Sequence, residues 1–164
     1  MLIYYINDMK DTRKRSHLNS SVNKTRKHKG KSSMSGKNIV VRYMLQMLMT
    51  VKLYHWNTLM YSVHKATDGL YGELNTLIDQ FVEVLLGKHN NVDKKNKGKI
   101  LDIKTLHVNN YTDNGGFKKE METYKKFLIG LDKHVKQNEN SDLFNIRDEI
   151  LSLLNKTTYL LTLE

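Results

Sequence analysis

Five residues that can bind a metal follow one another at short intervals in the middle of the chain. They are His55, His64, Asp68, Asp79 and Glu83, separated by steps of 9, 4, 11 and 4 residues. Mixed imidazole and carboxylate ligation suits iron, manganese or zinc. A partly open site that is rich in carboxylates can bind Fe(II) for oxidation by peroxide or oxygen. The spacing therefore predicts binding of iron, manganese, zinc or another first-row divalent metal.

The segment that carries four of these ligands has the pattern of an amphipathic helix. Its apolar stripe consists of Leu70, Leu74, Leu77, Phe81 and Leu85. At about 100° per residue, Asp68, Asp79 and Glu83 lie roughly opposite this stripe, with His64 somewhat to one side. The same face includes Gly72 and few charged residues, unlike an ordinary solvated face. We therefore expect a second buried surface, where Gly72 allows another helix to approach closely.

The distance along this helix decides how many chains a site needs. The His64–Asp68 pair and the Asp79–Glu83 pair are separated by about 16 Å, because each residue adds about 1.5 Å. Metal ligands must lie at about 2 Å from the ion, so one helix cannot supply both pairs to one site. An antiparallel second copy across a two-fold axis can supply the second pair. His55, on the preceding helix, lies level with Asp68 of its own chain. We expect His55, His64 and Asp68 from one copy and Asp79 and Glu83 from the other.

Several strings of residues resemble the Dps family of mini-ferritins. These are His55-Trp56-Asn57, the later His64, the segment Thr67–Leu74, and Ile78-Asp79-Gln80-Phe81-Val82-Glu83. The resemblance covers residues 38–89 well and residues 117–162 loosely. It implies an all-α, ferritin-like four-helix bundle, a ferroxidase site shared across a two-fold dimer, Trp56 beside that site, and a hollow dodecamer that stores iron.

The chain departs from the family pattern in three places. The interval from His55 to His64 is shorter than usual, and Lys65 stands where the family normally has glutamate. The segment from Asn90 to Gly116 is long and polar and shows no pattern of a crossover helix. The site motif survives these changes, whereas they argue against the dodecamer and its pores.

Each candidate ligand also has an ordinary structural interpretation when it is taken alone. A single histidine such as His55 is more often a hydrogen-bonding residue of the interior than a ligand. Asp79 and Glu83 alone would be solvated helix carboxylates, and Trp56 alone would belong to the core. The metal interpretation is favoured because five ligand types share helix-consistent spacing on one weakly charged face.

The positive charge of the chain is concentrated at its beginning. Residues 1–37 hold ten lysines and arginines against two aspartates, which accounts for +8 of the formal +10. Such a segment has too little apolar surface to order itself, so we expect a disordered basic tail. Non-specific binding to DNA phosphates is the favoured role, with nuclear import or solubility as alternatives. The candidate DNA-binding residues are Arg13, Lys14, Arg15, Lys24, Arg26, Lys27, Lys29 and Lys31.

Composition and the pattern of apolar residues limit the cellular compartments in which the protein is expected. There is no cysteine, so no disulfide framework is expected. No apolar run approaches the roughly 18 residues that span a bilayer. The apolar residues 1–6 have no basic residue before them, which makes a poor signal peptide. We expect a soluble intracellular protein with no membrane partner, in the cytoplasm, the nucleoid, the nucleus or a DNA-containing particle.

Apolar periodicity predicts four helices between residue 38 and residue 164. They are expected at residues 38–60, 63–87, 117–137 and 141–163, with residues 90–116 as a crossover linker whose part 100–108 is extended. Gly87 is the expected end of the second helix, and Ser141 is the expected N-cap of the last. His107 and His134 have no carboxylate at ligand spacing and are expected to be structural or exposed.

Two classes of function remain open. In the first, the chain is a ferroxidase that binds Fe(II) between two copies, oxidises it with hydrogen peroxide or oxygen, and sequesters the product. In the second, it is a non-catalytic ferritin-like protein that packages nucleic acid or serves as a structural component. Loss of iron oxidation on removal of Asp79 and Glu83 would separate the two classes.

Overall fold

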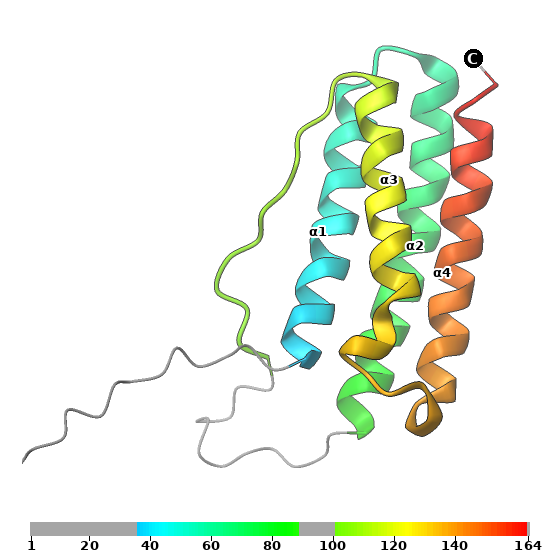
Figure 1. The fold of residues 1–164 in the computed structure, drawn as a ribbon. Coiled ribbons are helices and arrows are strands. Elements are labelled where there is room, and N and C mark those ends of the chain that lie inside the picture. Colours follow the sequence, from blue (N-terminus) through cyan, green and yellow to red (C-terminus); the bar gives the residue numbers. More distant parts are fainter. Residues whose placement is uncertain (1–35, 89–100, 164) are drawn as a thin grey trace, which may run out of the picture. The chain divides into compact units, whose positions relative to one another are not determined.

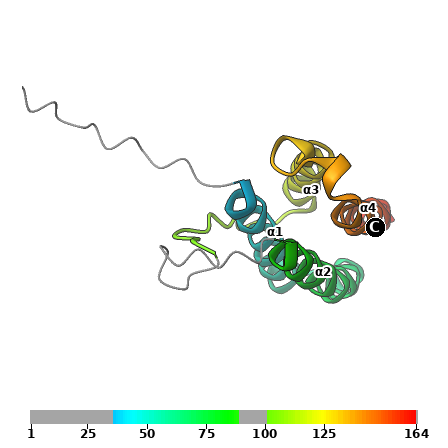
Figure 2. The same ribbon diagram turned by 90° about the horizontal axis from the view of Figure 1, so that it is seen from below.

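The computed structural model describes residues 36–88 and 101–163 of the chain. Across these two stretches the protein is all-helical and holds no strand, which confirms the predicted all-α class. The helices are α1 (Gly36–Asn57), α2 (Tyr61–Lys88), α3 (Asn114–Ile129) and α4 (Ser141–Leu160), with the short 3-10 helices η2 (Leu131–Lys133) and η3 (Gln137–Glu139). The four long helices lie side by side in a bundle-like arrangement (Figures 1 and 2).

The buried face of α1 differs from the predicted one. Apolar spacing along this helix predicts a core stripe of Ile39, Met44, Leu45, Leu48, Met49 and Lys52-Leu53. Of these residues only Met44 and Leu48 are buried, and the others are half-buried. The side chains that fill the core are Val40, Val41, Met44, Met47, Leu48, Val51 and Tyr54. The physical reason is that apolar residues occur on nearly every side of α1, so that their spacing alone does not select one face.

The buried face of α2 follows the predicted stripe closely. Leu70, Leu74, Phe81 and Leu85 are buried, whereas Leu77 is half-buried. Each buried side chain stabilises the fold by about 1.5–3 kcal/mol, because its apolar surface is removed from water. The expected end at Gly87 is wrong, because α2 continues to Lys88.

Helix α3 begins and ends earlier than its periodicity predicts. It begins at Asn114 because Asp113 caps it, accepting a hydrogen bond from the backbone N–H of Gly116 at 2.7 Å. It ends at Ile129, since Gly130 terminates the helix and the chain continues as 3-10 turns instead of reaching residue 137. The chain between Leu131 and residue 140 therefore forms the connection to α4 rather than a helix end.

The expected N-cap of α4 is also wrong. Asn140 occupies the N-cap position, and Ser141 is the first residue of the helix. Asp142 lies in the first turn, where its carboxylate accepts from the backbone N–H of Leu143 at 2.9 Å and pairs with Lys88 at 2.7 Å. A carboxylate there is favoured by the helix dipole, so Asp142 takes over part of the role expected of a capping residue.

The chain before α3 is extended, as expected for the part of residues 100–108 that is described. Residues 101–112 adopt neither helix nor strand and lie alongside α1 (Figure 1). The side chain of Gln46 donates to the carbonyl of His107 at 2.5 Å, and the side chain of Asn57 donates to the carbonyl of Tyr111 at 3.4 Å. Burial and the bond from the Tyr111 hydroxyl to Glu120 raise the pKa of Tyr111.

Membrane-spanning segments were sought in the described helices. None of those helices combines the length and the apolar character needed to cross a bilayer.

Candidate functional site

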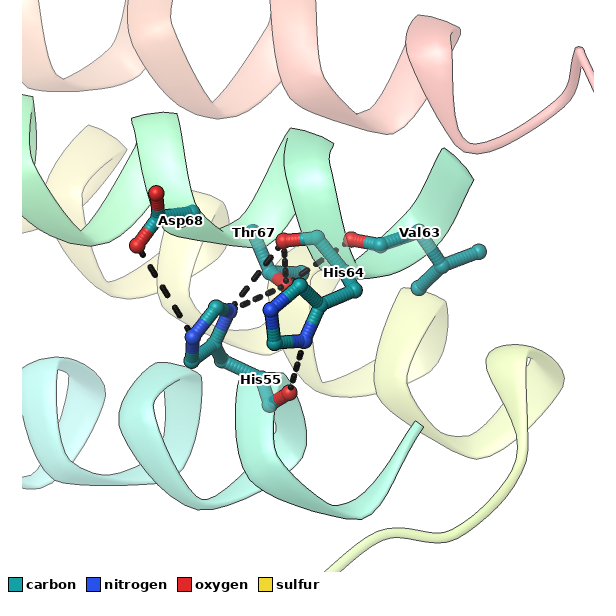
Figure 3. Close-up of polar contacts among 5 residues, drawn as sticks. All are labelled: His55, Val63, His64, Thr67 and Asp68. Carbon is teal, nitrogen blue, oxygen red and sulfur yellow. Dashed lines mark hydrogen bonds and ion pairs between the residues drawn. The ribbon is translucent and has the colours of Figure 1, made fainter. Parts of the chain in front are cut away.

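The two candidate histidines meet where α1 turns into α2. Residues 58–60 form the whole connection, which is held by bonds from the Thr58 N–H to the Tyr54 carbonyl and from the His64 N–H to the Met60 carbonyl. The rings of His55 and His64 stack with their centroids 4.0 Å apart and their planes at 26° (Figure 3). The short interval between the histidines therefore brings them together across a tight turn.

A reciprocal pair of hydrogen bonds sets the tautomer of both rings. Nδ1 of His55 lies 3.1 Å from the carbonyl oxygen of His64, and Nδ1 of His64 lies 3.0 Å from the carbonyl oxygen of His55. Because a carbonyl oxygen can only accept, both Nδ1 atoms must carry hydrogen. In the neutral imidazole the lone pair is then on Nε2, and a backbone bond of this kind is what commonly orients a metal-ligating histidine.

Thr67 adds a third bond to this arrangement and was not among the predicted site residues. Its buried hydroxyl lies 2.8 Å from the Val63 carbonyl and 3.1 Å from the His64 carbonyl, to which it donates. It can therefore accept from Nδ1 of His55 at 3.3 Å (Figure 3). The sequence signal for this residue was its place one turn after His64, on the side of α2 that faces α1.

Asp68 lies at the open edge of the histidine pair. Its Oδ1 atom is 3.8 Å from Nε2 of His55, and its side chain is 57 % exposed whereas that of His55 is 7 % exposed (Figure 3). This distance is too long for a hydrogen bond. The Nε2 lone pair of His55 and the Asp68 carboxylate therefore lie near each other without a hydrogen bond between them. Solvent reaches them from the side of the carboxylate.

The predicted half-site is assembled only in part. The described residues contain no group of three or more histidines, cysteines or carboxylates that could hold a metal ion. His55 and Asp68 approach each other as expected, but His64 does not join them as a third converging ligand. The reason is that its ring stacks on His55 and its Nδ1 is engaged by the α1 backbone.

Asp79 and Glu83 lie on the exposed side of α2, far along the helix from the histidines. They share one exposed stripe with Asp68, Gly72 and Asn75. The axial separation between Asp68 and Asp79 is about 16 Å, as the sequence predicts, so the two acidic residues do not reach the histidines of their own chain. A Cβ atom added at Gly72 would meet no atom within 4 Å. This stripe, which we call the α2 stripe, is therefore an open face along the part of the chain that is described.

Trp56 follows His55 on α1 and lies outside the core. Its side chain is 64 % exposed, so the interpretation of Trp56 as a core residue is wrong. The Lys52 ammonium lies 5.2 Å from the Trp56 ring centroid and 4.3 Å from that of Tyr71. These cation–π contacts join α1 to the side of α2 next to Asp68.

The remaining predicted residues lie elsewhere. His107 is exposed, and His134 is half-buried with its ring 5.7 Å from that of Phe127, as expected for histidines outside the site. The eight basic residues predicted to bind DNA, between Arg13 and Lys31, lie outside the described residues.

The chain is similar to a family of proteins over about two thirds of its length. A family model described as a family of unknown function (DUF5856) matches residues 55–161. No curated protein and no solved structure matches the chain. The matched region begins at His55 and contains all five candidate ligands, whereas the basic segment precedes it.

Proposed function

The chain belongs to the DUF5856 family, and we propose that it is a ferritin-like, Dps-like protein that takes Fe(II) as its substrate at a site shared by two copies. The observation that carries the proposal is the position of His55. Its lone-pair nitrogen faces the Asp68 carboxylate at the edge of an open helix face that also carries Asp79 and Glu83. The four-helix, ferritin-like bundle is part of the same proposal.

An antiparallel second copy completes the site in one register. In an antiparallel contact, all pairs of facing residues share the same midpoint in the sequence. The midpoint of Asp68 and Asp79 lies between residues 73 and 74, and so does that of His64 and Glu83. If Asp68 faces Asp79 of the second copy, His64 therefore faces Glu83 of that copy. The two-fold axis then passes near Gly72, whose missing side chain leaves room for the second helix. Each dimer would contain two equivalent sites.

The residues of this site have distinct chemical roles. Nε2 of His55 supplies a neutral nitrogen, and the carboxylates of Asp68, Asp79 and Glu83 supply anionic oxygens that favour the higher charge of Fe(III). Thr67 and the His64 carbonyl keep the His55 ring in the required tautomer. Two Fe(II) ions give two electrons to one hydrogen peroxide, whose O–O bond breaks, and two protons are taken up to form two waters.

Mixing two inactive variants tests whether the site is shared. His55→Ala removes one half of every site, and Asp79→Ala/Glu83→Ala removes the other half, so each variant alone should oxidise Fe(II) no faster than buffer. After subunit exchange at equal amounts, half the dimers are mixed, and each mixed dimer holds one intact site of two. We expect about a quarter of the wild-type rate to return, measured as ferric absorbance after Fe(II) and peroxide are added.

Two results would overturn this proposal. One is iron oxidation by Asp79→Ala/Glu83→Ala at the wild-type rate. The other is no recovery in a mixture whose subunit exchange has been verified by mass spectrometry. Asp148→Ala/Glu149→Ala is the matched control, because it removes two exposed carboxylates from α4 and should keep the wild-type rate.

We further propose that the basic segment binds DNA without sequence preference. The support is the charge of residues 1–37, which hold ten lysines and arginines against two aspartates. Replacing the eight residues predicted to bind DNA by glutamine should abolish a salt-sensitive gel shift and leave iron oxidation unchanged. An unchanged shift would rule this role out. A DNA shift without iron oxidation in wild-type protein would instead favour the non-catalytic packaging function.

A further inference from the structure

One end of the helical array exposes large apolar side chains. The turn between α1 and α2 and the end of α4 lie at this same end (Figure 1). Leu59 is fully exposed, Tyr61 is 77 % exposed and Tyr159 is 63 % exposed. Met60, Leu160 and Leu163 are also exposed, and together these six residues form what we call the apolar end.

The apolar end is held in place by polar contacts between chain segments. The Asn114 side chain and the Lys118 ammonium donate to the Leu161 carbonyl at 3.1 and 3.0 Å, which fixes the end of α4 to the start of α3. Asn57 at the end of α1 donates to the Tyr111 carbonyl at 3.4 Å, just before α3. The exposed side chains therefore project from a preorganised surface, which lowers the entropic cost of binding.

The exposed area is large enough to need an explanation. An aromatic side chain buries roughly 150–250 Å² when it is covered, so Tyr61 and Tyr159 alone expose on the order of 280 Å². The four aliphatic side chains bring the total to on the order of 600 Å², the upper end of the roughly 300–600 Å² seen for the largest patch of a typical monomer. A standard interface covers about 800 Å² on each partner.

The charges around this surface favour a second copy of the chain over an anionic partner. Lys65 and Asp68 follow Tyr61 on α2. Asp113 and Lys118 lie at the start of α3, which is bonded to the Leu161 carbonyl. An anionic membrane or nucleic-acid surface would require an excess of positive charge. A face that carries both signs can pair with itself about a two-fold axis.

We propose that the apolar end is an interface between copies of this chain, separate from the α2 stripe. Copies joined at both surfaces would form assemblies larger than a dimer. This inference does not require the iron chemistry, since it concerns side chains at the tip of the array rather than the candidate ligands.

Sedimentation velocity of the full chain over a range of concentrations tests the proposal. Leu59→Lys/Leu163→Lys should lower the mass of the largest species at least two-fold, with an unchanged melting temperature, because both residues are exposed. Ile129→Lys is the matched control: Ile129 is 64 % exposed on α3, away from the apolar end, and its replacement should leave the mass unchanged. Gly72→Arg blocks the α2 stripe and should remove only the other contact.

Several outcomes would overturn the proposal. One is a wild-type chain that is monomeric at all concentrations, and another is a Leu59→Lys/Leu163→Lys variant with the wild-type mass. Binding of wild-type protein to phosphatidylcholine vesicles that the variant loses, without a change of mass, would assign the apolar end to a lipid surface instead. Failure of the shared iron site would appear separately, as inactive iron chemistry in a chain that still assembles through the apolar end.

Discussion

The register of the proposed α2 contact can be tested with cysteines, because the chain has none of its own. If Asp68 faces Asp79 of a second copy, then Gly72 faces Asn75 of that copy. Both positions are exposed on the α2 stripe, and Gly72 has open space around its Cβ position. The variant Gly72→Cys/Asn75→Cys should therefore form two disulfides in each dimer, without disturbing the core of its own chain.

Helix geometry gives the expected distances. Packed helices lie about 8–10 Å apart, and each Cα atom is about 2.3 Å from its helix axis, so facing Cα atoms are about 3.4–5.4 Å apart. This range overlaps the roughly 4.4–6.8 Å that a disulfide requires. In a dimer with only one cysteine per chain, the two sulfur-bearing positions are offset along the axis by three residues, or about 4.5 Å. The single variants Gly72→Cys and Asn75→Cys should therefore cross-link several-fold more slowly than the double variant.

Non-reducing gel electrophoresis after mild oxidation measures these rates. The expected result is rapid dimer formation by the double variant, slower formation by either single variant, and none by Glu73→Cys/Gln80→Cys, which places both thiols off the stripe. Equal rates for single and double variants would indicate a parallel contact and refute the register. A double variant that stays monomeric would refute the contact itself, and with it the shared iron site.

Two further predictions concern the helices that hold the site in place. The Lys88 ammonium lowers the pKa of Asp142, so this pair stabilises the fold above the unfolded carboxyl pKa of about 3.9 and loses its effect as pH falls through the lowered folded value. The difference in urea midpoint between wild type and Asp142→Asn should therefore be present at about pH 6 and should shrink steadily as pH falls below about 3.9. A difference that stays constant with pH would assign the effect to something other than this ion pair. The buried Tyr124 hydroxyl donates to Thr50 at 2.9 Å, so Tyr124→Phe should cost about 0.5–1.5 kcal/mol in the free energy of unfolding, and an unchanged urea midpoint would contradict that role.

Much of the fold could be predicted because helix periodicity is a local signal. The stripe from Leu70 to Leu85 selects one face of α2 clearly, and the structure buries that face. The same argument failed on α1, where apolar residues surround the helix and only contacts with other helices decide which ones are buried. Helix ends failed for a related reason. Gly87 and Gly130 are both glycines near a helix end, yet only Gly130 terminates its helix.

The candidate site could be predicted in its composition but not in its details. Spacing placed Asp68, Asp79 and the histidines on the correct helices, since that depends on counting residues along regular structure. It could not show that His64 stacks on His55 or that Thr67 bonds to His55, because both depend on the three-residue turn between α1 and α2. Those contacts depend on the directions of backbone carbonyl groups, which a pattern of residue types does not predict.

The open α2 stripe links the local geometry of the histidines to the assembly of the protein. A helix that presents Asp68, Gly72, Asn75, Asp79 and Glu83 to solvent exposes three carboxylates without a single lysine or arginine on the stripe. Bringing two such faces together places like charges opposite each other, which costs free energy unless cations lie between them. The proposed contact should therefore depend on the metal: iron would neutralise the Asp68 and Asp79 carboxylates, and its removal by a chelator should weaken the dimer at the α2 stripe while leaving the contact at the apolar end unchanged.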